Sequence, residues 1–128
     1  MHVADRCRSV LVGTALGAAL LWGSMADAET APRSFVASPD VYKVLAEGNG
    51  LRIVLATWQP GQRDHWHSHP ASTYYWLTDC EARIYSPDGQ SRDYSIKAGT
   101  AGVQAPIESH SLENRSTQEC RDLIVERE

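Results

Sequence analysis

Hydrophobic and polar positions alternate along this chain in short runs, a pattern typical of β-strands. In residues 51–58, for example, Leu51, Ile53 and Leu55 share one face. No segment keeps a helical apolar period over three turns, and turns rich in Gly, Pro, Asn and Asp separate the runs. The pattern predicts strands at residues 40–46, 51–58, 64–69, 73–78, 81–86, 92–96, 102–105, 110–114 and 121–126. Strands of this length and spacing indicate an all-β fold, and we favour an antiparallel barrel or jelly roll.

The first 28 residues differ from this pattern. Arg6 and Arg8 precede an apolar run over residues 10–26, and Ala26-Asp27-Ala28 is a small-residue cleavage site. The run is shorter than the roughly 20 residues that span a bilayer, which favours a cleaved signal peptide (1–28) over an uncleaved anchor. We therefore expect a periplasmic or secreted protein without a membrane segment after cleavage. Residues 29–39 are small, polar and proline-containing and predict a mobile arm, which leaves residues 40–128 as one domain.

Charge and cysteine content narrow the range of partners. The chain has 12 Lys and Arg against 16 Asp and Glu, a net charge of −4. Residues 1–28 carry two Arg and two Asp, so their removal leaves this charge unchanged and argues against nucleic acid or anionic membrane as a partner. After loss of Cys7, Cys80 and Cys120 remain. In an exported chain they could form one disulfide or stay as two buried thiols.

Four histidines remain after cleavage, and they fall at two places: His65, His67 and His69 in one run, and His110 further on. Residues two apart on a strand face the same way, with Cα atoms about 6.6–7 Å apart. Two imidazoles from one strand can therefore point at one metal ion, and His110 is the other histidine available as a third ligand. The alternative is a histidine cluster without metal.

Two segments carry a family resemblance: GQRDHWHSH at residues 61–69 and GTAGVQAPIESHSLEN at residues 99–114. They resemble the two motifs of the cupin family, which contain a Gly, five residues and H-x-H, and then a Gly, a Pro and H-x-x-x-N. The resemblance implies a small single-domain cupin, a double-stranded β-helix or jelly-roll barrel that holds one divalent metal. It also implies that His67, His69 and His110 are the ligands and that Asn114 is structural.

The motifs also depart from the family pattern. The Glu of the first motif is missing, because Thr73 and Tyr74 stand where it is expected, and Cys80 stands at the following Gly position. The Pro of the second motif is one place late at Pro106, and Ile107 stands at its second Gly.

Loss of the carboxylate changes the chemistry of the predicted metal site. Three neutral imidazoles leave a divalent ion with its full charge, which favours anionic or bidentate oxygen ligands at the open positions. His65 could be a fourth ligand, or Glu108 could turn inward and replace the Glu. Exposed positions for both are the alternative.

Aromatic and basic residues near the motifs are candidates to line a ligand site. Trp66, Tyr74 and Tyr75 could face a small-molecule ligand, although core and surface packing accounts for most such residues. The arginines that could meet an anion, each with a solvated position as the alternative, are Arg52, Arg63 and Arg83.

The jelly-roll topology that the resemblance implies also bears on the cysteines. In it, Cys80 follows the strand at 73–78 and Cys120 precedes the last strand, and these two strands are antiparallel neighbours. This arrangement predicts a Cys80–Cys120 disulfide at the end of the barrel away from the metal.

Three functions remain open at this stage. The first is a metal-dependent enzyme, dioxygenase-like or other, that acts on a small, anionic substrate. The second is a non-catalytic cupin that binds a metal or small ligand, and the third is a metal-free barrel. Imidazole ligands do not distinguish Fe, Zn, Mn, Ni and Cu. The family resemblance also implies that a homodimer could form.

Overall fold

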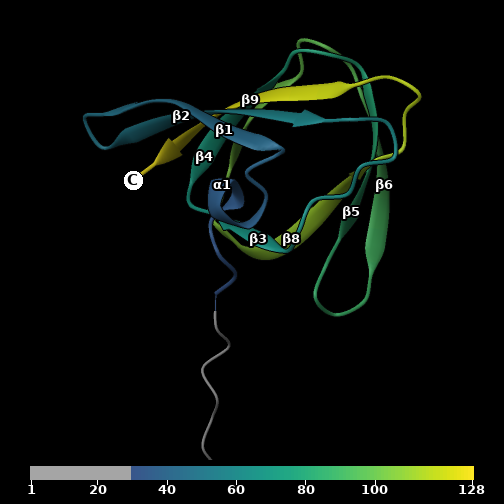
Figure 1. The fold of residues 1–128 in the computed structure, drawn as a ribbon, viewed down its shortest axis with the longest axis horizontal. Helices are drawn as coiled ribbons and strands as arrows, with labels where there is room; N and C mark the ends of the chain where they lie inside the picture. The colour runs from purple at the N-terminus through teal and green to yellow at the C-terminus, as the bar shows by residue number, and fades with distance from the viewer. Residues whose placement is uncertain (1–29) are drawn as a thin grey trace, which may run out of the picture.

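The computed structural model describes residues 30–128, so the expected signal peptide (1–28) lies outside the described residues. This part of the chain folds into nine strands and one short helix (Figure 1). The elements are α1 (Ser34–Ala37), β1 (Tyr42–Gly48), β2 (Leu51–Trp58), β3 (His67–His69), β4 (Ser72–Trp76), β5 (Cys80–Tyr85), β6 (Ser91–Ile96), β7 (Ala101–Gln104), β8 (Ile107–Asn114) and β9 (Cys120–Arg127). Within residues 30–128, no helix is long and apolar enough to cross a membrane.

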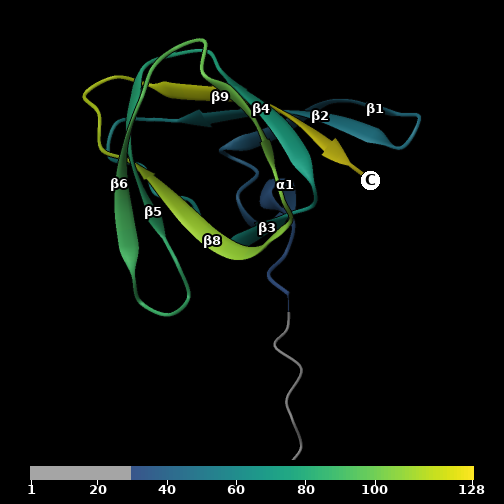
Figure 2. The same cartoon turned by 180° about the vertical axis from the view of Figure 1, so that it is seen from behind.

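The strands form two antiparallel sheets, as the alternation predicts. One sheet has the order β1-β2-β9-β4-β7 and the other the order β3-β8-β5-β6. Figures 1 and 2 show the sheets facing each other, with β2 and β9 in one layer and β8 and β5 in the other. Consecutive strands often lie in different sheets, so chemical groups distant in sequence meet between them.

Alternation along the strands separates the core from the surface. On β2, Val54, Ala56 and Trp58 are buried, and the residues between them are less so. β1 and β2 are joined by Asn49-Gly50, both with positive φ, between the paired residues Gly48 and Leu51. Asn-Gly is a favoured two-residue hairpin loop because both residues tolerate this conformation, so the sequence fixes the register of the first hairpin.

The nine strands predicted from the sequence are all present, with shifted ends. The strand expected at 64–69 begins only at His67, because the Asp64 carboxylate accepts the backbone N–H of Leu112 and holds the preceding segment outside the regular ladder. The strand expected at 110–114 begins earlier, at Ile107.

The expectation of a mobile arm at 29–39 is wrong for residues 31–39. These residues include α1, and Ser34 and Ser38 at its two ends are buried. The Ala31 N–H donates to the carbonyl of Glu108, and the Ser38 hydroxyl accepts the His65 N–H. The small polar residues of this segment suggested mobility. In the structure they pack against the barrel and form hydrogen bonds with its backbone N–H and C=O groups.

The predicted Cys80–Cys120 disulfide is confirmed, with the two Cα atoms 5.3 Å apart. It joins the start of β5 to the start of β9 and therefore connects the two sheets. Cys120 and Glu126 lie six residues apart on β9, roughly 20 Å along an extended strand. Because Glu126 contacts the histidines described below, the disulfide lies at the end of the barrel away from them.

Candidate metal centre

Three of the four histidines meet between the sheets. His67 and His69 lie on β3, and His110 lies directly opposite His67 on the neighbouring strand β8. A register shift between His67 and His69 interrupts the pairing, as a β-bulge does, and both side chains are nevertheless buried. One ligand atom of each of the three histidines lies within 4.8 Å of the others. The three histidines that the sequence analysis named as ligands therefore lie together in the structure.

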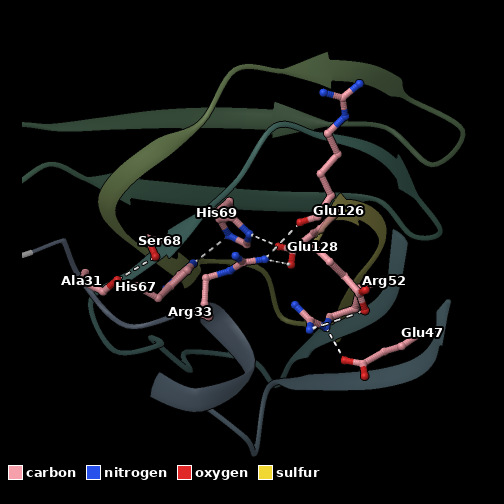
Figure 3. Close-up of polar contacts among 10 residues, drawn as sticks. Ala31, Arg33, Glu47, Arg52, His67, Ser68, His69, Glu126 and Glu128 are labelled. Carbon is pink, nitrogen blue, oxygen red and sulfur yellow. Dashed lines mark hydrogen bonds and ion pairs between the residues drawn. The ribbon is translucent and has the colours of Figure 1, made fainter. Parts of the chain in front are cut away.

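Hydrogen bonds to Nδ1 fix the orientation of two of these rings. His67 donates from Nδ1 to the carbonyl of His65 at 2.7 Å. His69 donates from Nδ1 to Glu126 Oε1, also at 2.7 Å (Figure 3). A neutral ring that donates from Nδ1 presents an unprotonated Nε2, which is the form that binds metal. Both rings therefore offer Nε2 as the ligand atom.

The Nε2 atoms form an arrangement that suits a metal ion. Nε2 of His67 and Nε2 of His69 lie 3.0 Å apart. Nε2 of His110 is buried and has no hydrogen-bond partner among the described residues. An ion bound at 2.0–2.1 Å from two ring nitrogens separates them by about 3 Å, so the observed spacing fits. A buried ring nitrogen without a partner is costly, and an ion at this point would provide one.

Burial keeps His67 and His110 neutral. Burial, followed by the charges of His67 and His69, lowers the pKa of His110 to about 3. Burial also lowers the pKa of His67, although the Asp64 carboxylate opposes this effect. Neutral imidazoles bind metal without first losing a proton, so protons do not compete for these two ligands at neutral pH.

Tyr42 brings a hydroxyl to the same point. Its oxygen lies 3.0 Å from Nε2 of His67 and donates to Asp64 Oδ2 at 2.8 Å. Asp64 also accepts the indole N–H of Trp58 at 2.9 Å and the backbone N–H of Leu112 at 2.7 Å. Burial, followed by the charge of Asp64, raises the pKa of Tyr42 well above its usual value. Tyr42 is therefore a protonated phenol beside the histidine cluster.

Glu126 is a buried carboxylate behind the cluster. It receives the Nδ1 hydrogen bond of His69 and an ion pair from Arg33, whose guanidinium lies 3.0 Å away (Figure 3). Burial raises the pKa of Glu126, but the hydrogen bonds and charges of His69 and Arg33 outweigh burial and hold the pKa below its usual range. A carboxylate behind a histidine orients the ring and raises its basicity.

Neither proposed substitute for the missing Glu joins the cluster. His65 and Glu108 are exposed, and the three-histidine group contains neither of them. The motif Glu was expected at position 73 or 74, on β4. Thr73 is exposed and Tyr74 is partly buried, so the inward side chain at this place is a phenol. The Tyr74 ring lies against Gly102 on β7, where a Cβ would approach ring atom Cζ to 2.6 Å.

A cavity of about 690 Å³ extends from the cluster between the sheets. His69 and His110 line it, and so does Tyr74, one of the three aromatic candidates. The other two, Trp66 and Tyr75, do not line it and are 41% and 48% exposed. None of the three candidate arginines lines it: Arg52 pairs with Glu47, Arg63 lies over the Tyr85 ring and Arg83 pairs with Asp93.

The sequence pattern did not predict four polar residues near the cluster: Tyr42, Asp64 and Glu126, which contact it or its supports, and Asp122, which lines the cavity. Asp122 and Glu126 could have been found from parity on the last strand. Both share the parity of Cys120, and a disulfide cysteine is expected to point inward. No comparable signal marks Tyr42 or Asp64, which reach the cluster only through tertiary packing.

The sequence matches no protein-family model, and no curated protein matches it. Solved structures do match the fold. A cupin domain from Bordetella pertussis is 18% identical with a TM-score of 0.63, covering 69% of this chain and 92% of its own. A protein with a double-stranded β-helix domain from Klebsiella pneumoniae is 23% identical with a TM-score of 0.53, covering 68% and 76%.

A third matching structure is that of DMSP lyases, which is 18% identical with a TM-score of 0.51 and covers 71% of this chain and 53% of its own. At these identities the matches bear on the fold, and they agree with the strand order and with the motifs in the sequence. The chain therefore has the fold of a cupin, a double-stranded β-helix barrel with three histidines that could bind a metal at its centre.

Proposed function

We propose that this protein binds one divalent transition metal through Nε2 of His67, His69 and His110. The observation that carries this proposal is the buried Nε2 of His110, which has no hydrogen-bond partner among residues 30–128 and lies close to the ring nitrogens of His67 and His69. Fe, Zn, Mn, Ni and Cu all suit imidazole ligands, so the donor set leaves the element open.

The donor set favours a small, anionic ligand with oxygen donors. Three neutral imidazoles leave a divalent ion its full charge, and its remaining coordination positions face a cavity rather than a protein carboxylate. A bound metal would supply Lewis acidity to a coordinated oxygen. Glu126 holds the His69 ring in its binding tautomer, and the Tyr42 hydroxyl lies close enough to interact with a group bound beside His67.

We further propose that the site is catalytic. DMSP lyases on a similar fold show that such barrels can be enzymes, although the likeness does not carry their reaction over. A non-catalytic metal- or ligand-binding role is the alternative. The carboxylates nearest the cluster favour this alternative, because their oxygens are already occupied and are not free to act as a general base. Asp64 accepts three hydrogen bonds, and Glu126 is bound by His69 and Arg33.

Turnover and binding can be separated on metal-reconstituted protein. Oxygen uptake and substrate loss are measured over small carboxylic acids, thiols and diketones, with His110→Ala and His65→Ala compared in parallel. Catalysis predicts conversion that requires His110 and tolerates the loss of the exposed His65. A ligand that is retained unchanged by protein containing metal would instead support the binding role.

We also propose that the mature protein is exported. The signal sequence at 1–28 and the Cys80–Cys120 disulfide support this, because disulfides persist in oxidising compartments. Sequencing of the mature N-terminus should find Glu29. The homodimer implied by the family resemblance stays a prediction, which sedimentation of the mature protein tests.

A further inference from the structure

One charged group in the cavity has no role in the proposed metal centre. Asp122 on β9 lines the cavity, is only 5% exposed, and has an Oδ1 atom that finds no hydrogen-bond partner within the part of the chain that the structure describes. It is not part of the three-histidine group. A buried carboxylate oxygen without a partner is costly, so a native structure that retains one calls for a functional explanation.

The rest of the cavity wall shows what kind of partner is missing. Among residues 30–128, no Lys or Arg lines it, and Asp122 is the only carboxylic acid that does. Aromatic side chains line it as well, among them Trp58 and Trp76, whose rings are stacked with centroids 6.0 Å apart. Trp76 is paired with Asp122 across the β4–β9 ladder. Aromatic rings beside a carboxylate favour cations, in particular those that are weakly hydrated.

Asp122 is not a member of the three-histidine group, although His69 and His110 line the same cavity. Glu126, which supports His69, is four residues from Asp122 on the same strand, and four residues span about 13 Å. A ligand that reaches both regions therefore needs a spacer between its two charged ends.

We propose that the cavity binds a small zwitterion, with its anionic end at the histidine-bound metal and its cationic end between Asp122 and the neighbouring aromatic rings. This inference rests on the proposed metal site and specifies the class of its ligand. Burial raises the pKa of Asp122 to about 7, and nearby backbone amides of Tyr75 and Leu123 oppose this effect. Above that pH the carboxylate is ionised, and the cation neutralises a charge that otherwise lacks a partner.

Two acids of the same shape test the proposal on zinc-loaded protein at pH 8. The zwitterion 4-(trimethylammonio)butanoate and 5,5-dimethylhexanoate differ only in a charged nitrogen in place of a carbon. By calorimetry we expect wild-type protein to bind the zwitterion at least tenfold more tightly. Asp122→Asn, which keeps the shape of the side chain, should abolish this preference. Glu119→Gln, an exposed change before β9, should keep it.

The outcomes distinguish this inference from the metal proposal. Zinc content is measured on the same samples. Zinc-loaded protein that binds the two acids equally, prefers the neutral one, binds neither, or keeps its preference in Asp122→Asn would overturn the zwitterion proposal and leave the metal site standing. Failure to retain zinc would overturn both. The comparison of the two acids on wild-type protein does not depend on whether the Asn variant folds.

Discussion

The buried Asp122 carboxyl should make the metal-free protein less stable as the pH rises. Burial raises its pKa from 3.8 to about 7 in the folded state. Between these values the folded protein holds a proton that the unfolded chain has released. Stability therefore falls with increasing pH across this interval, whereas the usual surface carboxylate has the opposite effect. Below pH 3.8 the group contributes nothing, and above about pH 7 its cost is complete.

The magnitude follows from the shift. A difference of about 3 pKa units at 1.36 kcal/mol each corresponds to about 4 kcal/mol, an upper value because the cavity admits some water. Asp122→Asn removes the titrating group and keeps its shape. Relative to wild type, the variant should gain little at pH 4 and up to about 4 kcal/mol at pH 8.

Urea unfolding of metal-free wild-type and variant protein, followed by tryptophan fluorescence at several pH values, measures this gain. All other ionisable groups are the same in both proteins, so their contribution largely cancels in the difference. Exposed Glu119→Gln serves as the control and should show a flat difference across the range. A stability difference for Asp122→Asn that does not change with pH would refute the reasoning, because it would mean that the carboxyl is hydrated in the folded protein.

Three further predictions concern individual contacts. Reduction of the Cys80–Cys120 disulfide, which closes a loop of 40 residues, should lower the free energy of unfolding by about 4 kcal/mol in urea titrations, and an unchanged midpoint would contradict this. Glu126→Gln should weaken metal affinity by about 10–100-fold in competition with a chelator, because His69 loses its charged partner; unchanged affinity would show that the carboxylate does not tune the site. Gly102→Ala should cost about 1–3 kcal/mol through overlap with the Tyr74 ring, and a cost that persists in a Tyr74→Ala background would exclude that cause.

The strands and the pairing of His67 with His69 could be predicted from local spacing, whereas the third member of the cluster, His110, came from the family resemblance and from its being the other histidine available. Period-two alternation marks a strand wherever the chain is half-buried, and H-x-H places two rings on one face of it. The disulfide needed more than spacing, since it depends on which strands are neighbours, and the family resemblance supplied that information.

The residues that support the cluster could not be predicted in the same way. Asp64 lies in a segment without regular pairing and takes part in the site by accepting hydrogen bonds from three different elements. Residues 31–39 look mobile by composition, because the contacts that order them are backbone hydrogen bonds to distant residues such as Glu108. Tertiary packing determines whether such residues are ordered and which groups they contact, and the local sequence pattern carries little information about that packing.

Metal content of the mature protein tests the proposed site most directly. Wild type, His67→Ala, His110→Ala and His65→Ala are each reconstituted with divalent transition metals, freed of excess metal and measured by mass spectrometry. We predict one equivalent per chain in wild type and in His65→Ala, whose changed side chain is exposed, and a loss in the other two variants. Near-zero metal in all four proteins, or equal metal in all four, would contradict binding at the three histidines.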